Sequence, residues 1–197
     1  EIGFGWGGLA ERLAQEGCRV TGITLSPAQL DFARQRVQAA GLGDKVALHL
    51  QDYRDVTGTF DRIVSIEMFE AVGREYWDGY FRTVHDKLKP GGRACVQSIV
   101  IDDALWPRYI RSTDFIQQYI FPGGCLPCPS ELRRQAEAAG LAGALAPGAP
   151  RSVTMPLFGT DGDGPRIERP VSTRADIDAL VGAIDLTSLQ PTCDAIR

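Results

Sequence analysis

The chain has 197 residues, of which 44% are hydrophobic and 23% are charged, a composition typical of one globular domain with its own core. Its net charge of −4 comes without any basic block, which argues against nucleic acid as a partner and against a polybasic membrane patch. No run is apolar and long enough to cross a bilayer, no signal peptide is visible and the five cysteines are scattered, so we expect a cytoplasmic protein.

The first eight residues, Glu1-Ile-Gly-Phe-Gly-Trp-Gly-Gly8, form a glycine-rich segment. Glycine adopts positive φ at no steric cost and lets a ligand approach the backbone closely. Residues 9–16 have a helical pattern, so the segment precedes a helix N-terminus, where free N–H groups can meet polar ligand atoms. The segment predicts a loop that holds a nucleotide-like cofactor at the end of a first strand.

Two cofactor classes fit this loop. Gly3, Gly5 and Gly8 satisfy the dinucleotide fingerprint G-x-G-x-x-G, whereas Gly3, Gly5 and Gly7 satisfy the E-x-G-x-G-x-G loop of S-adenosylmethionine (SAM) methyltransferases. A dinucleotide site requires an acid about 20 residues further on, to hold the ribose hydroxyl. The next predicted strand, 19–23, ends in Thr24-Leu-Ser26 without a carboxylate, which favours SAM over NAD.

Strands and helices alternate along the following residues. We predict further strands over 46–51, 60–66 and 93–101 and helices over 27–40 and 75–88, with Ser26 as an N-cap, Gly41 as a stop signal and a turn at 89–92. This alternation predicts an α/β fold with a doubly wound, mostly parallel sheet and helices on both faces. Ligands of such folds bind beyond the carboxyl ends of the strands.

Two short motifs could hold metal or redox chemistry. Cys125-Leu-Pro-Cys128 is a C-x-x-C, but it lies in a Pro/Gly-rich turn with neither a helix start nor a second Cys/His pair beside it, so we interpret it as two loop cysteines. Asp161-Gly-Asp-Gly164 lacks the remaining acids of a calcium loop and is interpreted as a turn. The sequence therefore predicts no metal site.

Six segments carry a more specific signal. They are residues 1–8, Val20-Thr-Gly-Ile-Thr-Leu-Ser26 with Gln29, Gln51-Asp-Tyr-Arg-Asp55, residues 60–73, Leu88-Lys-Pro-Gly-Gly92 and Tyr119-Ile-Phe-Pro-Gly-Gly-Cys-Leu-Pro127. In this order they resemble the cyclopropane-fatty-acid synthase family of class I SAM-dependent methyltransferases. The resemblance covers residues 1–141 and implies a SAM-dependent methyltransferase domain there. Residues 142–197 are then a Gly/Pro-rich tail with one short helix, 174–184, capped by Thr173.

The resemblance assigns the cofactor contacts residue by residue. Gly3, Gly5 and Gly7 would lie against the methionine part of SAM, Thr24, Leu25 and Gln29 would contact its ribose and adenosine side, and Asp52 and Tyr53 would frame the adenine. The implied substrate is an unsaturated acyl chain of a phospholipid, converted to a cyclopropane or a methyl-branched product. Transient contact with a membrane surface is implied as well, so the protein would be cytoplasmic or peripheral at the membrane.

The resemblance also assigns catalytic residues. Glu70 matches the family's active-site glutamate, which orients a bound bicarbonate, and Gln97 and Ile99 stand where a histidine and an isoleucine usually line that site. Two bare anions repel, so Glu70 would act through a proton relay or by orienting a donor. Methyl transfer to an alkene leaves a carbocation, and aromatic faces attract cations. The aromatic candidates are Phe69, Tyr76, Trp77 and Tyr119.

Several family features have no counterpart in this sequence. The family's helical N-terminal region with its bicarbonate-site cysteine is not seen, no Tyr follows Tyr119, and Gln97 replaces the histidine. Glutamine donates a hydrogen bond but does not titrate. We therefore expect a chain truncated at its N-terminus, with weak SAM binding and no measurable lipid chemistry. The alternatives are a methyltransferase for another small molecule and an inactive SAM-binding fragment.

Overall fold

The computed structural model describes residues 1–141. The predicted tail at 142–197 lies outside the described residues, and so do the turn at Asp161 and the helix expected after Thr173.

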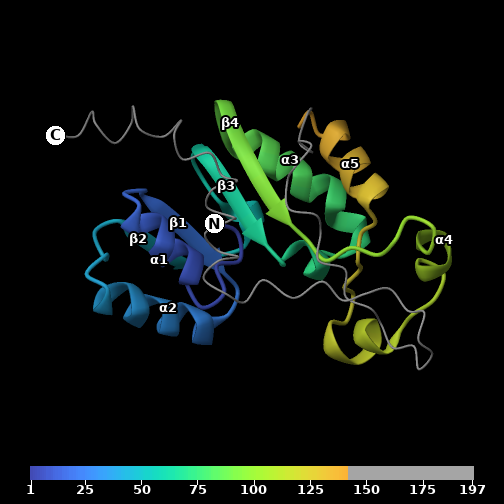
Figure 1. The fold of residues 1–197 in the computed structure, drawn as a ribbon, viewed down its shortest axis with the longest axis horizontal. Helices are drawn as coiled ribbons and strands as arrows, with labels where there is room; N and C mark the ends of the chain where they lie inside the picture. Colours follow the sequence, from blue (N-terminus) through green and yellow to red (C-terminus); the bar gives the residue numbers. More distant parts are fainter. Residues whose placement is uncertain (142–197) are drawn as a thin grey trace.

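The described part of the chain is organised around parallel strands. These are β1 (Val20–Thr24), β2 (Val46–Leu50), β3 (Phe60–Ile66) and β4 (Leu88–Gln97). β1 pairs with β2, and β3 pairs with β4. Ile2 joins the two pairs through parallel bridges to Ile23 of β1 and Ser65 of β3, so the order across the sheet is β2, β1, Ile2, β3, β4 (Figure 1). The predicted α/β fold with a parallel sheet is confirmed.

Helices cover both faces of this sheet. They are α1 (Gly8–Gln15), α2 (Pro27–Ala39), α3 (Trp77–Lys87), α4 (Trp106–Tyr109) and α5 (Pro129–Ala138). Successive residues of a strand point to opposite faces. Val64 of β3 packs with residues of α1 and α2, whereas its neighbour Ile63 packs with residues of α3 and α5. The two helix pairs therefore lie on opposite faces.

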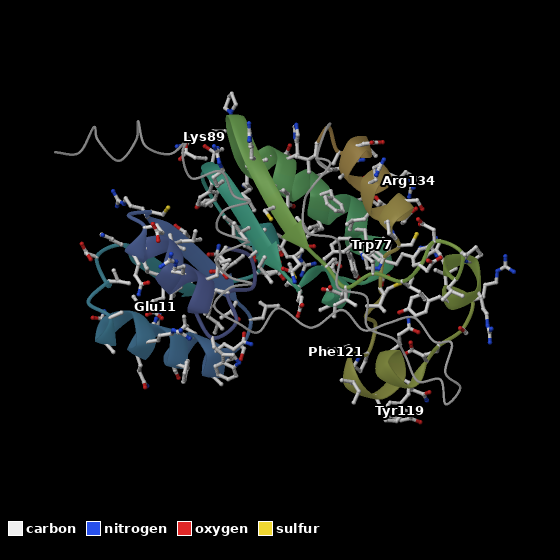
Figure 2. The ribbon with its side chains drawn as sticks, viewed as in Figure 1. Glu11, Trp77, Lys89, Tyr119, Phe121 and Arg134 are labelled. Atoms are coloured by element: carbon white, nitrogen blue, oxygen red, sulfur yellow. The ribbon has the colours of Figure 1, made fainter. Side chains whose placement is uncertain are left out.

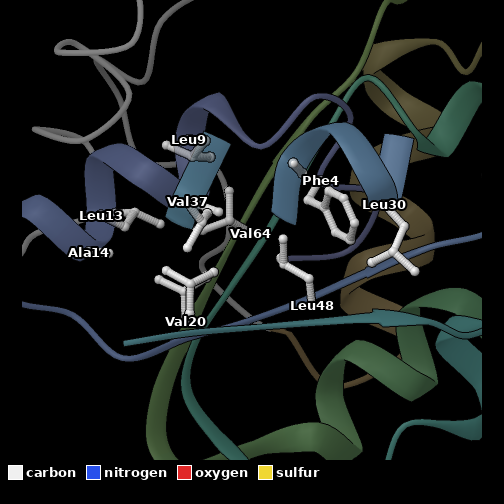
Figure 3. Packing of buried hydrophobic residues seen from close by; sticks show 12 residues of the cluster. Phe4, Leu9, Leu13, Ala14, Val20, Leu30, Val37, Leu48 and Val64 are labelled. Carbon is white, nitrogen blue, oxygen red and sulfur yellow. The ribbon is translucent and has the colours of Figure 1, made fainter. Parts of the chain in front are cut away.

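The core on the α1/α2 face consists of aliphatic residues with a single phenylalanine (Figure 3). Its buried members include Phe4, Leu9, Leu13, Val20, Leu30, Val37, Leu48 and Val64. The core on the other face is aromatic. Phe69, Trp77, Tyr80 and Phe81 are buried there, with ring centroids 5.1 Å apart for Phe69 and Trp77 and 5.2 Å apart for Phe69 and Phe81. Aromatic rings supply much buried area and prefer such offset or edge contacts.

The local signals around α2 work as predicted. Ser26 is the N-cap, and its hydroxyl accepts a hydrogen bond from the Gln29 amide at 3.3 Å. Pro27 occupies the first turn, where its missing N–H costs no hydrogen bond. Gly41, with φ of 69°, stops the helix in the left-handed conformation that favours glycine.

Two predicted boundaries in the second half were wrong. The strand expected at 93–101 is Leu88–Gln97, because the turn at 89–92 is absorbed as an irregularity: Phe60 pairs with Leu88 and Arg62 with Arg93. After Gln97 the chain leaves the sheet, and the Ile101 amide bonds to the Pro127 carbonyl at 2.9 Å. The helix expected from residue 75 begins at Trp77, after a 3₁₀ turn, η3 (Arg74–Tyr76).

Three shorter turns complete the described elements. They are the 3₁₀ turns η1 (Tyr53–Asp55) and η2 (Phe69–Ala71) and the π-helical turn η4 (Ile116–Ile120). Within residues 1–141, no helix has the length and apolar character that a membrane span requires.

Candidate functional site

The residues singled out from the sequence gather where the parallel strands end. The glycine-rich loop follows Ile2, Thr24 ends β1, Asp52 follows β2, Glu67 follows β3 and Gln97 ends β4. In a parallel sheet these ends share one edge, and open α/β sheets bind their ligands in the crevice beyond it. The candidate residues therefore lie together at one edge of the sheet.

The glycines of the loop have distinct structural roles. Gly3, Gly5 and Gly7 have φ of 77°, 54° and 78°, all in the left-handed region. A Cβ added to Gly3 would lie 2.9 Å from Met68 Cγ, and one added to Gly7 would lie 2.8 Å from Ala33 Cβ. At Gly5 an added Cβ would meet no described atom within 4 Å. Gly3 and Gly7 are thus required by packing, whereas Gly5 leaves open space above the backbone.

Trp6 lies between these glycines and is largely exposed. Its ring meets the Phe32 ring of α2 edge-on, with centroids 5.3 Å apart, and 55% of Trp6 remains accessible. The loop therefore contacts α2 through an aromatic pair at the surface.

The end of β1 is held by a small hydrogen-bond cluster. The Thr24 hydroxyl donates to Gln29 Oε1 at 2.9 Å and accepts from the Ser26 amide at 3.2 Å. Thr24 is buried, whereas Leu25 is 71% exposed. The structure thus brings Thr24 and Gln29 together and turns Leu25 outward, which leaves an apolar surface beside the loop.

Asp52 and Tyr53 face different surroundings. The Asp52 carboxylate accepts hydrogen bonds from the Arg54 backbone amide, Nε and Nη2 at 2.9, 2.9 and 2.7 Å, and these contacts with Arg54 hold its pKa below the usual range. The Tyr53 ring packs edge-on against Tyr80, with centroids 5.4 Å apart, and burial raises the pKa of its hydroxyl. Asp52 therefore stays ionised at the surface, while the Tyr53 ring packs against the core.

Glu67 lies among the candidate residues at this edge, although it was not singled out from the sequence. It has φ of 49°, a conformation uncommon for any residue other than glycine, and such strained residues cluster at functional sites. Its amide donates to the Gln97 carbonyl at 2.9 Å, and the Gln97 Nε2 donates to its Oε1 at 3.2 Å. The sequence did offer a signal for Glu67, because an acidic residue directly after a buried parallel strand lies at the edge of the sheet where ligands bind. Gln97 is thereby tied to Glu67.

Glu70 lies at the meeting point of three segments distant in sequence. Its Oε1 accepts a hydrogen bond from the Ile99 amide, and its carbonyl accepts one from the Cys125 amide at 2.9 Å. Its Oε2 is buried and bonds to none of the described residues. Burial raises the pKa of the Glu70 carboxyl, although the Glu70 and Ile99 backbone amides and the Ser98 side chain oppose that shift. The structure thus joins Glu70 with Ile99, as a site shared by both would require.

The four aromatic candidates are not brought together. Phe69 and Trp77 are fully buried, and the Trp77 Nε1 donates to the Val72 carbonyl at 2.8 Å, so both are core residues whose faces are covered by neighbouring rings. Tyr76 and Tyr119 are 54% and 63% exposed. Figure 2 shows Trp77 in the interior and Tyr119 at the periphery. The expectation that these four line one cation site is wrong for Phe69 and Trp77.

The C-x-x-C pair is buried, and one detail of its interpretation was wrong. Cys128 does precede a helix start, as the N-cap of α5. Burial nevertheless raises the pKa of Cys128, and it raises that of Cys125 to about 11, which is opposite to the shift of reactive thiols. Within the described residues, no three His, Cys, Asp or Glu side chains are grouped closely enough to hold a metal ion.

A short stretch of exposed apolar side chains adjoins the Glu70 region. The exposed side chains of Phe115, Tyr119, Ile120 and Phe121, here called the apolar segment, are each more than half accessible. The Phe115 and Tyr119 rings contact each other with centroids 5.0 Å apart. Gly124, just beyond the segment, approaches the Glu70 carbonyl so closely that an added Cβ would lie 3.1 Å from it. The apolar segment is therefore joined directly to the Glu70 region.

Comparison with protein families and curated proteins gives consistent matches. A family model described as "Mycolic acid cyclopropane synthetase" matches residues 1–144. Tuberculostearic acid methyltransferase UfaA1 of Mycobacterium tuberculosis is 46% identical over 127 residues, which are 64% of this chain and 30% of that protein. Cyclopropane-fatty-acyl-phospholipid synthase of Escherichia coli is 39% identical over 138 residues, 70% of this chain and 34% of that protein. The chain thus spans about a third of the length of these relatives.

Solved structures support the same fold. Mycolic acid cyclopropane synthase CmaA1, complexed with SAH and CTAB, aligns with a TM-score of 0.62 and 28% identity, covering 71% of this chain and 52% of that one. The cyclopropane synthase MmaA2 from Mycobacterium tuberculosis aligns with the same values. The [4+2]-cyclase SpnF, at 24% identity and a TM-score of 0.58, shares the fold alone.

Proposed function

Because the chain belongs to the mycolic acid cyclopropane synthetase family, we propose that its site transfers a methyl group from SAM to the double bond of an unsaturated acyl chain of a phospholipid. The observation that carries the proposal is the convergence at one sheet edge of a glycine loop open at Gly5 and a buried carboxylate at Glu70. Loss of a proton from the methylated chain would give a cyclopropane or a methyl-branched chain that keeps a double bond.

The residues at the edge fit SAM. The open space above Gly5 admits a ligand against the backbone, which a side chain at that position would fill. Gln29, positioned by its hydrogen bond from Thr24, would face the ribose and adenosine side of SAM, and the Asp52 carboxylate, kept ionised by Arg54, would face the adenine. When bound, SAM supplies an electrophilic methyl group on a positively charged sulfur.

The described residues fit bicarbonate poorly. The Ile99 amide already donates to Glu70, and the Gln97 amide already donates to Glu67. A buried anion requires hydrogen-bond donors around it, and the Ile99 amide and one of the two side-chain N–H groups of Gln97 already donate to carboxylates. Bicarbonate therefore has no step in the proposed reaction.

Glu70 itself is the better candidate for the proton acceptor. When the alkene carbon bonds to the methyl group, the acyl chain is left with a carbocation that must lose a proton. Glu70 has a raised pKa and an Oε2 without a partner among the described residues, and a carboxylate with a raised pKa is a stronger general base. The hydrogen bonds that Glu70 accepts from the Ile99 and Cys125 amides hold its Oε2 in one place.

The apolar segment suits contact with the lipid that carries the substrate. Its exposed rings and the exposed Arg108 and Arg111 nearby combine apolar area with positive charge, as interfacial anchors do. A double variant, Tyr119→Ser with Phe121→Ser, should bind anionic phospholipid vesicles at least several-fold more weakly in a flotation assay. Leu50→Ser, at another exposed apolar residue, is the matched control and should bind as the parent does.

The proposal is tested with methyl-labelled SAM and vesicles of either monounsaturated or fully saturated phospholipid. If the chain by itself transfers the methyl group, mass spectrometry of the released acyl chains should show label only with the unsaturated lipid. No label with either lipid would agree with the expectation of no measurable lipid chemistry. Label in a water-soluble acceptor would favour the small-molecule methyltransferase instead. SAM binding measured by calorimetry without any transfer would favour the inactive SAM-binding fragment.

A further inference from the structure

The backbone of Glu67, directly after β3, is strained. Within residues 1–141, Glu67 alone among the residues other than glycine has positive φ. Glycine adopts this conformation freely, whereas a residue with a Cβ clashes with its own backbone there. The Glu67 amide is fixed by its hydrogen bond to the Gln97 carbonyl at 2.9 Å. Such strain persists only where the surroundings impose it, and it is commonest at ligand sites.

Glu67 lies between the glycine loop and the Glu70 region. On one side, its neighbour Met68 lies against the loop, because a Cβ added to Gly3 would lie 2.9 Å from Met68 Cγ. On the other side, the Glu67 Oε1 accepts a hydrogen bond from Gln97 Nε2 at 3.2 Å at the end of β4, and Glu70 follows in η2. The Glu67 side chain is exposed, so its carboxylate is open to a ligand bound at this edge.

The contacts assigned to SAM leave one part of the cofactor for this position. The methionine part is assigned to the glycine loop, and the ribose and adenine are assigned to the ends of β1 and β2. The methyl group must point toward the acyl chain at Glu70. The sulfur is bonded to all three parts, so it would lie between the glycine loop and the ends of β3 and β4, where Glu67 lies.

This part of the edge carries negative charge that no described side chain neutralises. Within residues 1–141, the Glu67 carboxylate bonds to the neutral Gln97 amide and forms no ion pair. The pKa of Glu70 is raised mainly by burial, and the negative charge of Glu67 adds to that rise. A cation near two such carboxylates favours their charged forms. The sulfur of SAM is positively charged, whereas the sulfur of S-adenosylhomocysteine (SAH) is neutral.

We propose that Glu67 makes the site prefer SAM over SAH, by placing its carboxylate beside the positively charged sulfur. The Gln97 amide would hold that carboxylate in position. The inference rests on the proposed function, since it requires SAM at this sheet edge. Its consequence is that the cofactor, once it has lost its methyl group and its charge, is bound less tightly and leaves the site.

The test compares two ligands by calorimetry. Glu67→Gln keeps the shape of the side chain and removes its charge. This variant should bind SAM at least roughly fivefold more weakly than the parent does and should bind SAH within about twofold. A SAM analogue in which a protonated amine replaces the methylated sulfur should be weakened as SAM is. A loss for SAM but not for this analogue would assign the effect to the fit of the methyl group and would overturn the proposal.

Two further variants separate the charge of Glu67 from other effects. Glu67→Gly removes the carboxylate and the backbone strain together, so it should fold and should lose the preference for SAM as Glu67→Gln does. Asp52→Asn removes a carboxylate at the same edge, on the adenine side, and should change the affinities for SAM and SAH by the same factor. Thermal melts verify that all the variants fold.

The parent protein separates this inference from the proposed function. A parent that binds neither SAM nor SAH would overturn both. A parent that binds SAM and SAH equally well, or a preference that survives in a folded Glu67 variant, would overturn this inference alone. The same holds for a preference that is lost as fully in Asp52→Asn. A preference that is lost in both Glu67 variants and kept in Asp52→Asn supports the inference.

Discussion

In the half of the domain around β1 and β2, the candidate site residues are held by contacts close in sequence, whereas in the half around β3 and β4 they are held by contacts between distant segments. Ser26 caps α2 from three residues away, and Thr24 reaches Gln29 across five. By contrast, Glu70 meets Ile99 across 29 residues and Cys125 across still more. The end of β1 can therefore be ordered with little outside help, while the Glu70 carboxylate is positioned only once the second half has folded.

The core of the second half should be the most sensitive point. Trp77 is fully buried, contacts Phe69 and donates to the Val72 carbonyl, so Trp77→Ala should lower the free energy of unfolding by about 3–5 kcal/mol. Urea denaturation measures it. The control is Tyr76→Ala, at a neighbouring aromatic residue that is 54% exposed, where we expect a change within about 0.5 kcal/mol. Similar losses in both variants would contradict the assignment of Trp77 to the core.

Replacing the Glu70 carboxylate should lower the activity but raise the stability of the protein above the pKa of that carboxyl. As the proposed proton acceptor, Glu70→Gln should lower the rate of methyl transfer by roughly 10²–10⁴-fold wherever the parent rate is measurable. Because burial raises the pKa of folded Glu70, its stabilising contribution is present at low pH and is lost as the pH rises through that pKa. The variant should therefore be more stable than the parent at about pH 8, with the difference shrinking toward about pH 4.

Thermal melts across this pH range provide the measurement. Glu67→Gln is the matched control, since Glu67 is an exposed carboxylate at the same sheet edge. A difference for Glu70→Gln that grows toward low pH would mean that the ionised carboxylate stabilises the fold, contrary to the sign expected from its burial.

A substitution in the glycine loop should affect SAM binding more than it affects stability. Gly5→Val places a branched side chain in the open space above the loop and should weaken SAM binding at least roughly tenfold in calorimetry. Gly58→Val is the control: Gly58 also has positive φ, at 82°, and open space around an added Cβ, but it lies between β2 and β3. Valine is disfavoured at positive φ, so both variants should lose a similar amount of stability. Equal SAM affinities of the two variants would therefore show that the loop does not contact the cofactor.

The smallest effect is expected at the cap of α2. Ser26→Ala removes the hydroxyl that accepts from the Gln29 amide and should cost about 1 kcal/mol of stability. Ser112→Ala, which removes a hydroxyl at the C-terminal end of α4, should change stability by no more than about 0.5 kcal/mol. If Ser26→Ala proves neutral in urea denaturation, local capping contributes less to the first half than we infer.

The same contrast explains what could be predicted from the sequence. Ser26, Pro27 and Gly41 are local signals that fix the ends of α2, and Ile63, Val64 and Ile66 mark β3, so these elements were predicted within a residue or two. The end of β4 was not, because the chain leaves the sheet to make bonds such as Ile101 to Pro127. No local pattern encodes a partner that far along the chain.

The site likewise has features that the sequence predicted and features that it did not. The glycine-rich segment predicted a loop in which positive φ is tolerated, and Gly3, Gly5 and Gly7 do have positive φ. The motif order brought Glu70 and Ile99 into one group, which the structure joins by a hydrogen bond, but it did not reveal that Gln97 pairs with Glu67. The aromatic faces of Phe69 and Trp77 were misjudged because composition near a site does not say which side of the sheet a ring occupies.

The position of Trp6 gives the glycine loop an optical signal of its own. Of the three tryptophans, Trp77 is fully buried and stacks on Trp106 with centroids 5.8 Å apart, whereas Trp6 is 55% exposed. Emission from an exposed indole is red-shifted and accessible to dissolved quenchers, while that of a stacked, buried indole is not. Trp106 is partly exposed, so iodide quenching should report mainly on the loop and to a lesser degree on α4. A ligand that binds against Gly5 should then protect part of the fluorescence without any added label.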